Sequence, residues 1–207
     1  MKRFMRNGCA TGLVLLALLV VSVLTARLGL YPFLARQAPV ATDTLVIEGW
    51  LSDPVLAQLD SWLATNAIKR IYTTGGPLET GSYLIAWTNY ADLTRARLIQ
   101  LGYDQRYDLT AVPAPKVRRD RTRESARALR AVWPLERGAF NLVSEGPHTR
   151  RSWRAFQQVF GDGVEVGSIA LVPEAYDARD WWTCSEGLRT VLTETFGYIY
   201  DRLFGAP

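Results

Sequence analysis

Five short apolar runs, separated by segments of helical periodicity, constrain the fold of this chain more than any other feature. The apolar runs cover residues 44–47, 70–74, 109–112, 140–143 and 169–172. Apolar residues recur at helical spacing in the other segments, at about 54–66, 90–101, 121–133, 148–161 and 185–204. This alternation favours right-handed crossovers and a parallel sheet that is covered on both faces. We therefore predict a three-layer α/β, Rossmann-like domain with a mostly parallel five-stranded sheet.

An apolar stretch from residue 9 to 26 precedes this domain and follows the basic residues Lys2, Arg3 and Arg6. Its length suits one membrane-spanning helix. A cleaved signal peptide is the alternative, but the stretch is longer than a usual signal core and lacks a pair of small residues at the positions that cleavage needs. We favour an uncleaved signal anchor. The basic start then predicts a cytoplasmic N-terminus and an extracytoplasmic, periplasmic domain on the inner (plasma) membrane.

The chain accordingly divides into three parts. Residues 1–27 are predicted to form the basic start and the transmembrane anchor, residues 28–42 a juxtamembrane linker, and residues 43–207 the α/β domain. A domain of this size can bury a substantial core without disulfides or metals. One histidine and no Cys-x-x-Cys pair provide no metal-ligand spacing, so we predict no metal site.

Positive charge is concentrated between Lys116 and Arg130, where seven basic residues accompany two acidic ones. A solvated basic helix face is the slightly preferred interpretation. The alternative is a contact surface for anionic lipid headgroups or an anionic ligand. Nucleic acid is not predicted as a partner, because no nucleic-acid-binding motif is present.

The segment 144–152, Ser-Glu-Gly-Pro-His-Thr-Arg-Arg-Ser, is the predicted centre of the site. A strand ends there, the chain turns at Gly146, and a helix begins with the only histidine, His148. His148 and Arg151 are three residues apart, so they share one face if both lie in the first helical turn. Free N–H groups at a helix N-terminus, together with Arg150 and Arg151, suit a phosphate or a carboxylate.

Glycine follows three of the predicted strands, in the sequences Glu-Gly-Trp (48–50), Thr-Gly-Gly (74–76) and Ser-Glu-Gly (144–146). Ligands of parallel α/β sheets bind at the carboxyl ends of the strands, where the strand order reverses, and glycine allows close approach of the backbone. Neither a dinucleotide-binding nor a P-loop fingerprint is present. A ligand site at this edge is therefore predicted without a named cofactor.

Two residues are candidates for acid–base chemistry. Glu48 is predicted to be a general base, because a carboxylate at a buried strand end is costly unless it is paired, with Glu145 and Glu79 as competitors. His148 is predicted to transfer a proton or to bind phosphate, the alternative being a structural hydrogen bond. Arg151 is expected either to grip an anion or to form a surface ion pair, with equal weight.

Thr122 is expected to cap a helix, and Glu194 and Tyr198 to serve packing and pairing. Of Trp181 and Trp182, one is expected to be buried and the other to line the cleft. The complete set of predicted ligand-binding residues is Gly49, Trp50, Thr74, Gly75, Gly76, Glu79, Arg121, Thr122, Ser144, Glu145, Arg150, Arg151 and Trp182.

Several of these motifs, in this order, resemble those of the ElyC/SanA/YdcF family of bacterial envelope proteins. They are Leu-Val-Ile-Glu-Gly (45–49), Thr-Thr-Gly-Gly-Pro (73–77), Thr-x-Glu-Ser-Ala (122–126) and His-x-Arg-Arg-Ser (148–152). A membrane-anchored branch is most similar, through Glu-Gly-Trp (48–50), Gly-Gly-Pro-Leu-Glu-x-Gly (75–81), Asp-Arg-Thr (120–122) and Trp-Trp-x-x-Ser-Glu-Gly (181–187). The resemblance extends over 43–203. Ser125 departs from it, since much of the family has Asn there.

The resemblance implies a Rossmann-like fold and a role in the cell envelope linked to peptidoglycan and lipid carriers. It carries the family's glycine loop onto Gly75 and Gly76, its helix cap onto Thr122, and its His-x-x-Arg onto His148 and Arg151. We therefore expect a membrane-anchored envelope-biogenesis protein that binds an anionic, phosphate-bearing metabolite such as a lipid-linked intermediate; whether it also processes that metabolite stays open. The alternatives are a non-catalytic scaffold for envelope enzymes and, third, a nucleotide or S-adenosylmethionine binder.

Overall fold

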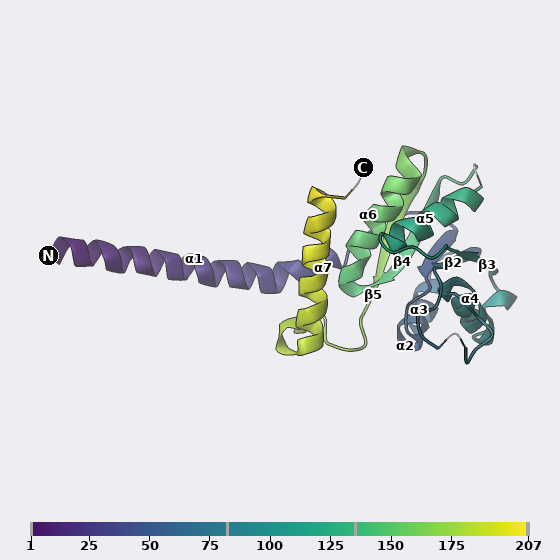
Figure 1. Cartoon of the computed structure of the whole chain (residues 1–207), viewed down its shortest axis with the longest axis horizontal. Coiled ribbons are helices and arrows are strands. Elements are labelled where there is room, and N and C mark those ends of the chain that lie inside the picture. Colours follow the sequence, from purple (N-terminus) through teal and green to yellow (C-terminus); the bar gives the residue numbers. More distant parts are fainter. Residues whose placement is uncertain (1, 82, 135, 206–207) are drawn as a thin grey trace.

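The computed structural model of the chain describes residues 2–81, 83–134 and 136–205, those from 2 to 12 by their backbone alone. The predicted α/β, Rossmann-like domain is confirmed (Figure 1). Its five strands are all parallel and lie in the order β3-β2-β1-β4-β5. Their bounds are β1 Thr44–Glu48, β2 Arg70–Gly75, β3 Asp108–Pro113, β4 Ala139–Glu145 and β5 Glu165–Leu171.

Strand β1 lies at the centre of the sheet and is buried on both faces. Successive side chains of a strand point to opposite faces: Leu45 and Ile47 belong to one core cluster, and Val46 belongs to the other. Helices α2, α3 and α4 contribute to the first cluster, and helices α5 and α6 to the second. Their bounds are α2 Asp53–Ala57, α3 Leu59–Leu63, α4 Tyr90–Gln100, α5 Arg121–Val132 and α6 Thr149–Phe160.

The strand order reverses next to β1. From β1 the chain moves outward through β2 to β3, and it then returns to the other side of β1 to form β4 and β5. A crevice at the carboxyl edge is expected where the crossovers diverge in this way. Glu48 ends β1 and Glu145 ends β4, so the two carboxylates lie on the two sides of this switch point.

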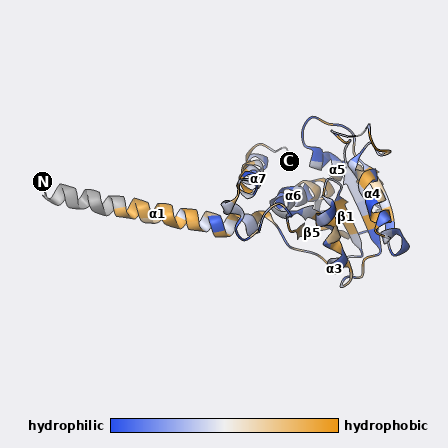
Figure 2. Cartoon of the chain, turned by 90° about the horizontal axis from the view of Figure 1, so that it is seen from below, coloured by the Kyte–Doolittle hydropathy of each residue, from blue (hydrophilic) through white to orange (hydrophobic). Residues whose placement is uncertain are grey.

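Helix α1 (Lys2–Leu34) extends away from the domain as a long rod (Figure 1). Its segment Leu13–Leu34, with a mean hydropathy of 2.5, is long and apolar enough to cross a membrane. Figure 2 shows this apolar stretch, which ends where the rod meets the domain. Apolar side chains from 13 to 24 are exposed along it, as expected of a surface that faces lipid.

The predicted linker 28–42 is instead part of the domain. Residues up to Leu34 continue α1, and Leu34 is buried with Trp181 and Val191 because these apolar side chains exclude water together. Beyond the helix, Ala38 pairs with Ser168 of β5 in an antiparallel bridge. The apolar helix therefore continues directly into segments that pack on the domain.

Two local expectations need correction. The helix expected at 54–66 is divided at Gln58 into α2 and α3, and the Gln58 amide pairs there with the backbone N–H and C=O of Val172. Thr122 does not cap α5. The backbone at Asp120 takes a left-handed turn with φ 57°, so the helix begins at Arg121 and Thr122 lies inside its first turn.

The last helix, α7 (Ser185–Leu203), follows the short 3₁₀ turn η4 (Trp181–Thr183). It packs against the end of α1 through Val191 and against α6 through Glu194, which faces the start of that helix. In Figure 1 it stands between the rod of α1 and the sheet. Helix α7 therefore forms one wall of the region at the carboxyl edge of the sheet.

Candidate functional site

A cleft of about 1370 Å³ opens at the carboxyl edge of the sheet. It is lined by the ends of β1 and β2, the loop 75–81, the loop 114–120 with the start of α5, the junction of β4 with α6, and one side of α7. Small-molecule pockets usually measure roughly 300–1,000 Å³. The cleft therefore has room for a ligand larger than a simple metabolite.

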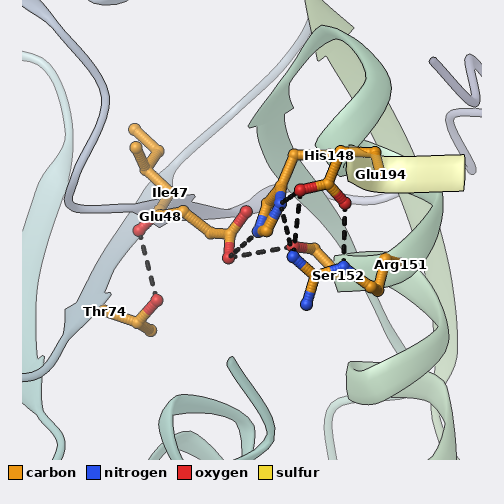
Figure 3. A network of polar contacts seen from close by, with 7 residues as sticks. All are labelled: Ile47, Glu48, Thr74, His148, Arg151, Ser152 and Glu194. Carbon is orange, nitrogen blue, oxygen red and sulfur yellow. Dashed lines mark hydrogen bonds and ion pairs between the residues drawn. The ribbon is translucent and has the colours of Figure 1, made fainter. Parts of the chain in front are cut away.

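Glu48 is the most unusual group in the cleft. Its side chain is only 5% exposed, although it is a carboxylate at the end of a central strand. Ser152 Oγ donates a hydrogen bond of 3.0 Å to Oε1, and Oε2 has no hydrogen-bond partner in the described chain (Figure 3). A buried carboxylate that is only partly hydrogen-bonded destabilises the fold. Glu48 therefore has an unused acceptor at the edge of the cleft.

His148 lies beside Glu48, with 3.9 Å between its Nε2 and Glu48 Oε1. It is the last residue of the 3₁₀ turn η2 (Gly146–His148), which begins at Gly146 with φ +40°, a left-handed value that favours glycine. The imidazole packs edge-on against the exposed ring of Trp50, with 5.1 Å between ring centroids. Its side chain is 18% exposed, so the cleft can reach it.

Glu194 of α7 fixes the other nitrogen of this imidazole. The distance from His148 Nδ1 to Glu194 Oε1 is 2.9 Å. A carboxylate oxygen only accepts hydrogen bonds, so this contact favours the tautomer with the proton on Nδ1; Arg151 Nη2, 3.1 Å from the same nitrogen, would donate to it only in the other tautomer. In the neutral ring this leaves Nε2, which faces Glu48, as the unprotonated nitrogen. The geometry thus presents a base at Nε2, or an N–H donor there when the ring is charged.

Arg151 forms the third member of this cluster. Its Nε and Nη2 contact the two oxygens of Glu194 at 2.8 and 3.0 Å, a bidentate ion pair. Burial opposes ionisation of Glu194, but the hydrogen bonds and charges of His148 and Arg151 outweigh it and lower the pKa to about 2. Burial also opposes the charge of Arg151, and Glu194 outweighs it and raises the pKa of that guanidinium. The ion pair of Arg151 is therefore largely buried rather than the surface pair that was one of its two interpretations, and Arg151 still lines the cleft, so the anion grip stays a prediction.

A second part of the cleft has a basic wall. Lys116, Arg118 and Arg119 line the cleft from the loop before α5, and none of them forms an ion pair in the described chain. The loop leads into the N-terminus of α5, where the Asp120 side chain makes no capping hydrogen bond. Free N–H groups at a helix N-terminus favour an anion. Arg121 is already paired, at 2.5 Å, with Glu79 of the loop 75–81.

Helix α6 differs from α5 in this respect. Its first turn continues directly from η2, because His148 has helical backbone angles and Thr149 N–H already donates to Gly146 O. The predicted anion site at a helix N-terminus therefore fits α5 better than the start of α6. Besides Arg151, α6 brings a second cation to the cleft: Arg154 lines it, and its buried Nε has no hydrogen-bond partner in the described part of the chain.

Charge is divided between the walls rather than uniformly positive. Burial raises the pKa of Glu145, the nearby charge of His148 lowers it in part, and Glu174 adds to the rise. Burial likewise raises the pKa of Asp201 on α7, partly offset by the charge of Arg151. The cleft is thus lined both by carboxylates from β1, β4 and α7 and by the cations of the loop before α5. Such a cleft suits a ligand with an anionic part and a part rich in hydrogen-bond donors.

The structure brings most of the predicted residues together. Those that line the cleft are Glu48, Trp50, Thr74, Gly75, Gly76, Glu79, Arg121, Thr122, Glu145, His148 and Arg151.

Four other predicted residues do not line the cleft. Gly49 is packed tightly, since a Cβ there would lie 2.6 Å from Tyr90 O. Ser144 is fully buried in β4. Arg150 instead contacts the end of α1, where its Nε donates to Phe33 O. Trp182 packs beneath the Arg27 guanidinium, 4.1 Å from the ring centroid, so neither it nor the buried Trp181 lines the cleft.

Sequence reasoning missed two members of the cluster. Glu194 forms a pair, as the sequence predicts, but nothing in the sequence links it to His148, which lies 46 residues earlier. Ser152 closes the predicted segment 144–152 but was given no role, although its position one helical turn after His148 indicates a shared face. Among the described residues, no group of three or more His, Cys, Asp or Glu side chains is arranged to hold a metal ion.

Comparisons of the chain with protein-family models, with curated proteins and with solved structures find no match. The residues and the geometry of the cleft therefore have to support any functional proposal.

Proposed function

We propose that this chain is a membrane-anchored envelope-biogenesis protein whose α/β domain binds an anionic, phosphate-bearing envelope metabolite in the cleft, such as a lipid-linked or peptidoglycan-related intermediate. Support comes from a helix apolar enough to cross a membrane, a large cleft with a basic wall, and the motifs that resemble the ElyC/SanA/YdcF family. In this proposal the basic N-terminus stays in the cytoplasm and the domain lies outside the inner membrane.

The observation that carries the proposal is the buried Glu48 carboxylate: its Oε1 lies 3.9 Å from His148 Nε2, and its Oε2 has no hydrogen-bond partner among the described residues. A structural carboxylate would have both oxygens satisfied, because an unpaired buried oxygen lowers stability. A ligand hydroxyl or amide N–H at the edge of the cleft would satisfy Oε2. Ligand binding therefore explains why a buried carboxylate oxygen that lowers the stability of the free protein is present, whereas a purely structural role does not.

The two walls of the cleft suit the two parts of such a ligand. Phosphate oxygens are bound well by unpaired cations and by a helix N-terminus, and both are present at Lys116, Arg118 and Arg119 before α5. Sugar or peptide donors suit the carboxylates, and Trp50 and Tyr90 provide aromatic faces among the lining residues. A phosphate-bearing glycan or peptide carrier presents both kinds of group.

The same geometry can support proton transfer. The Nδ1–H of His148 is held by the ionised Glu194, so Nε2 is the nitrogen that can exchange a proton. Glu48 Oε2 can orient the ligand hydroxyl or accept its proton. In this proposal binding is the primary function, and turnover is sought once a ligand is found.

The test is thermal unfolding of the full chain in detergent micelles with polyprenyl phosphate, lipid-linked sugars, nucleotides and S-adenosylmethionine. A ligand at about 100 times its Kd should stabilise the protein by about 2.7 kcal/mol. We expect a shift with the phosphate-bearing lipids only, and a smaller shift at high salt, because screening weakens contacts with the exposed cations.

Two variants give the test its controls. Glu48→Gln keeps the shape and removes the buried charge, so the free protein should be as stable or more stable while the ligand-induced shift is lost. A double Arg118→Gln, Arg119→Gln variant should keep its stability and lose affinity. No shift with any compound, together with a destabilised Glu48→Gln protein, would contradict the proposal and favour the scaffold alternative.

A further inference from the structure

One face of α7 is apolar and exposed. Leu188, Leu192, Phe196, Ile199 and Leu203 are between 39% and 69% exposed. Their spacings of three and four residues place them along a single stripe of the helix. We call this stripe the outer face of α7. A soluble α/β domain has no reason to keep such a stripe in water.

The other sides of α7 are occupied. Val191 and Tyr198 pack on the end of α1. Three acidic residues, Glu186, Glu194 and Asp201, line the cleft. Successive residues of an α-helix are rotated by roughly 100° about its axis. By this rotation the three acidic residues lie nearly opposite the outer face, and the residues that contact α1 lie between the two. The outer face therefore looks away from the cleft and from the sheet.

The end of α1 is fixed against this helix. Trp181 Nε1 donates to Arg27 O at 3.1 Å, and the Arg27 guanidinium lies over Trp182. Phe33 meets Tyr198 edge-on, with 5.2 Å between ring centroids. These contacts from Arg27 to Leu34 set the direction in which the apolar rod leaves the domain.

Helix α7 lies crosswise to α1, as the two views together show (Figures 1 and 2). The rod leaves on the side of α7 that faces away from the sheet (Figure 1). The acidic residues of α7 face the cleft, so the outer face, which is nearly opposite them, points to the same side as the rod. If α1 spans the membrane, α7 therefore lies along the bilayer surface. The residues of α1 that pack near α7, Leu30 to Leu34, lie about three to seven residues beyond Arg27. This separation is roughly 5–10 Å along the axis of α1.

We propose that α7 is an interfacial helix whose outer face lies on the lipid bilayer, so that the protein contacts the membrane at two places, the span α1 and the surface helix α7. An amphipathic surface helix buries its apolar face to roughly 5–10 Å at the boundary of headgroups and acyl chains, which matches the height of α7 above Arg27. This inference depends on α1 as a span and is independent of what the cleft binds.

A lipid surface is a better occupant than a second copy of the chain for two reasons. The exposed apolar side chains of α1 lead up to the segment of α1 that packs on α7, so the outer face lies close to the proposed span. Its surroundings also fit the headgroup layer: Trp182 lies beside Arg27, and Arg189 and Arg202 of α7 are exposed. Tryptophan is enriched at the membrane interface, and an arginine near a helix end can extend its charged group to the headgroups.

The test places a fluorescent NBD label on single cysteines in the full chain, after Cys9→Ser and Cys184→Ser. Serine at 184 keeps an acceptor for Gly187 N–H at the start of α7. The label sites are Phe196→Cys on the outer face, Leu16→Cys on α1 and Glu136→Cys on the exposed loop before β4. The proteins are reconstituted in vesicles of phosphatidylethanolamine and phosphatidylglycerol, and circular dichroism confirms that each is folded.

Quenchers on the lipid acyl chains and iodide in the water then report the depth of each label. We expect label 196 to resemble label 16, with strong lipid quenching and several-fold weaker iodide quenching than label 136. Iodide quenching of label 196 equal to that of label 136 would overturn the proposal. Protection of label 196 from both quenchers would also overturn it, because protein would then cover the outer face. If lipid quenchers do not quench label 16, α1 does not span the bilayer, and the inference, which depends on that span, is wrong.

Discussion

The loss of stability on removal of the Glu194 charge follows directly from the structure. Glu194 is 11% exposed and accepts hydrogen bonds from His148 and Arg151. Its pKa lies at about 2 in the folded protein against an ordinary 4.5. Since one pH unit corresponds to ~1.4 kcal/mol, the ionised carboxylate contributes about 3 kcal/mol of stability at neutral pH. Glu194→Gln should lose this amount.

The assay is thermal unfolding of the full chain in detergent, followed by tryptophan fluorescence. A loss of about 3 kcal/mol should lower the midpoint by about 6–12 °C in a domain of this size. Glu186→Gln is the matched control on the same helix, because its ion pair with Arg189 is solvent-exposed and should contribute less than ~1 kcal/mol.

The pH dependence gives a second check with a defined sign. The folded-state pKa of Glu194 is lowered, so its contribution is fully present above the unfolded pKa of 4.5 and disappears as the pH falls toward about 2. The difference between the wild-type and Glu194→Gln midpoints should stay constant from pH 8 to pH 5 and shrink below that. A difference under ~1 kcal/mol at pH 7, or one that does not change at low pH, would refute the reasoning.

Two further predictions concern stability near the cleft. Gly146→Ala should destabilise the protein by about 1–3 kcal/mol, because φ is +40° and the new Cβ would lie 2.8 Å from Pro173 Cγ, whereas Gly138→Ala, with open space around it, should stay within ~0.5 kcal/mol in the same unfolding assay. Ser152→Ala removes the hydrogen bond to the buried Glu48 carboxylate and should cost about 2 kcal/mol by urea unfolding. It should cost clearly less in a Glu48→Gln background, and an equal cost in both backgrounds would show that the two side chains are not coupled.

The layers of the fold could be predicted because local patterns determine them. Each of the five strands is a short apolar run in the sequence, and each falls where it was expected within a few residues. The order of the strands in the sheet depends on contacts between distant segments, such as β1 with β4. Periodicity carries no information about such pairings, so the position of the switch point required the structure.

The sequence predicts the members of the candidate site that lie at strand ends, but not the members that helix α7 contributes. Glu48, His148 and the glycine loop follow from the rule that ligands bind at carboxyl ends of parallel strands. The partner of His148 comes from α7, whose placement depends on how the end of α1 packs. The same packing explains why a segment expected to be a linker became part of the core: Leu34 has an apolar partner, Val191, that lies far away in sequence.

The most direct test of the account is a structure of the full chain determined with a polyprenyl phosphate bound. The account predicts phosphate density within hydrogen-bond distance of the N-terminus of α5 and of Arg118 or Arg119, with ligand donors near Glu48 Oε2. Phosphate density elsewhere on the protein, or a cleft without ligand at saturating concentration, would contradict the claim that this cleft is the binding site.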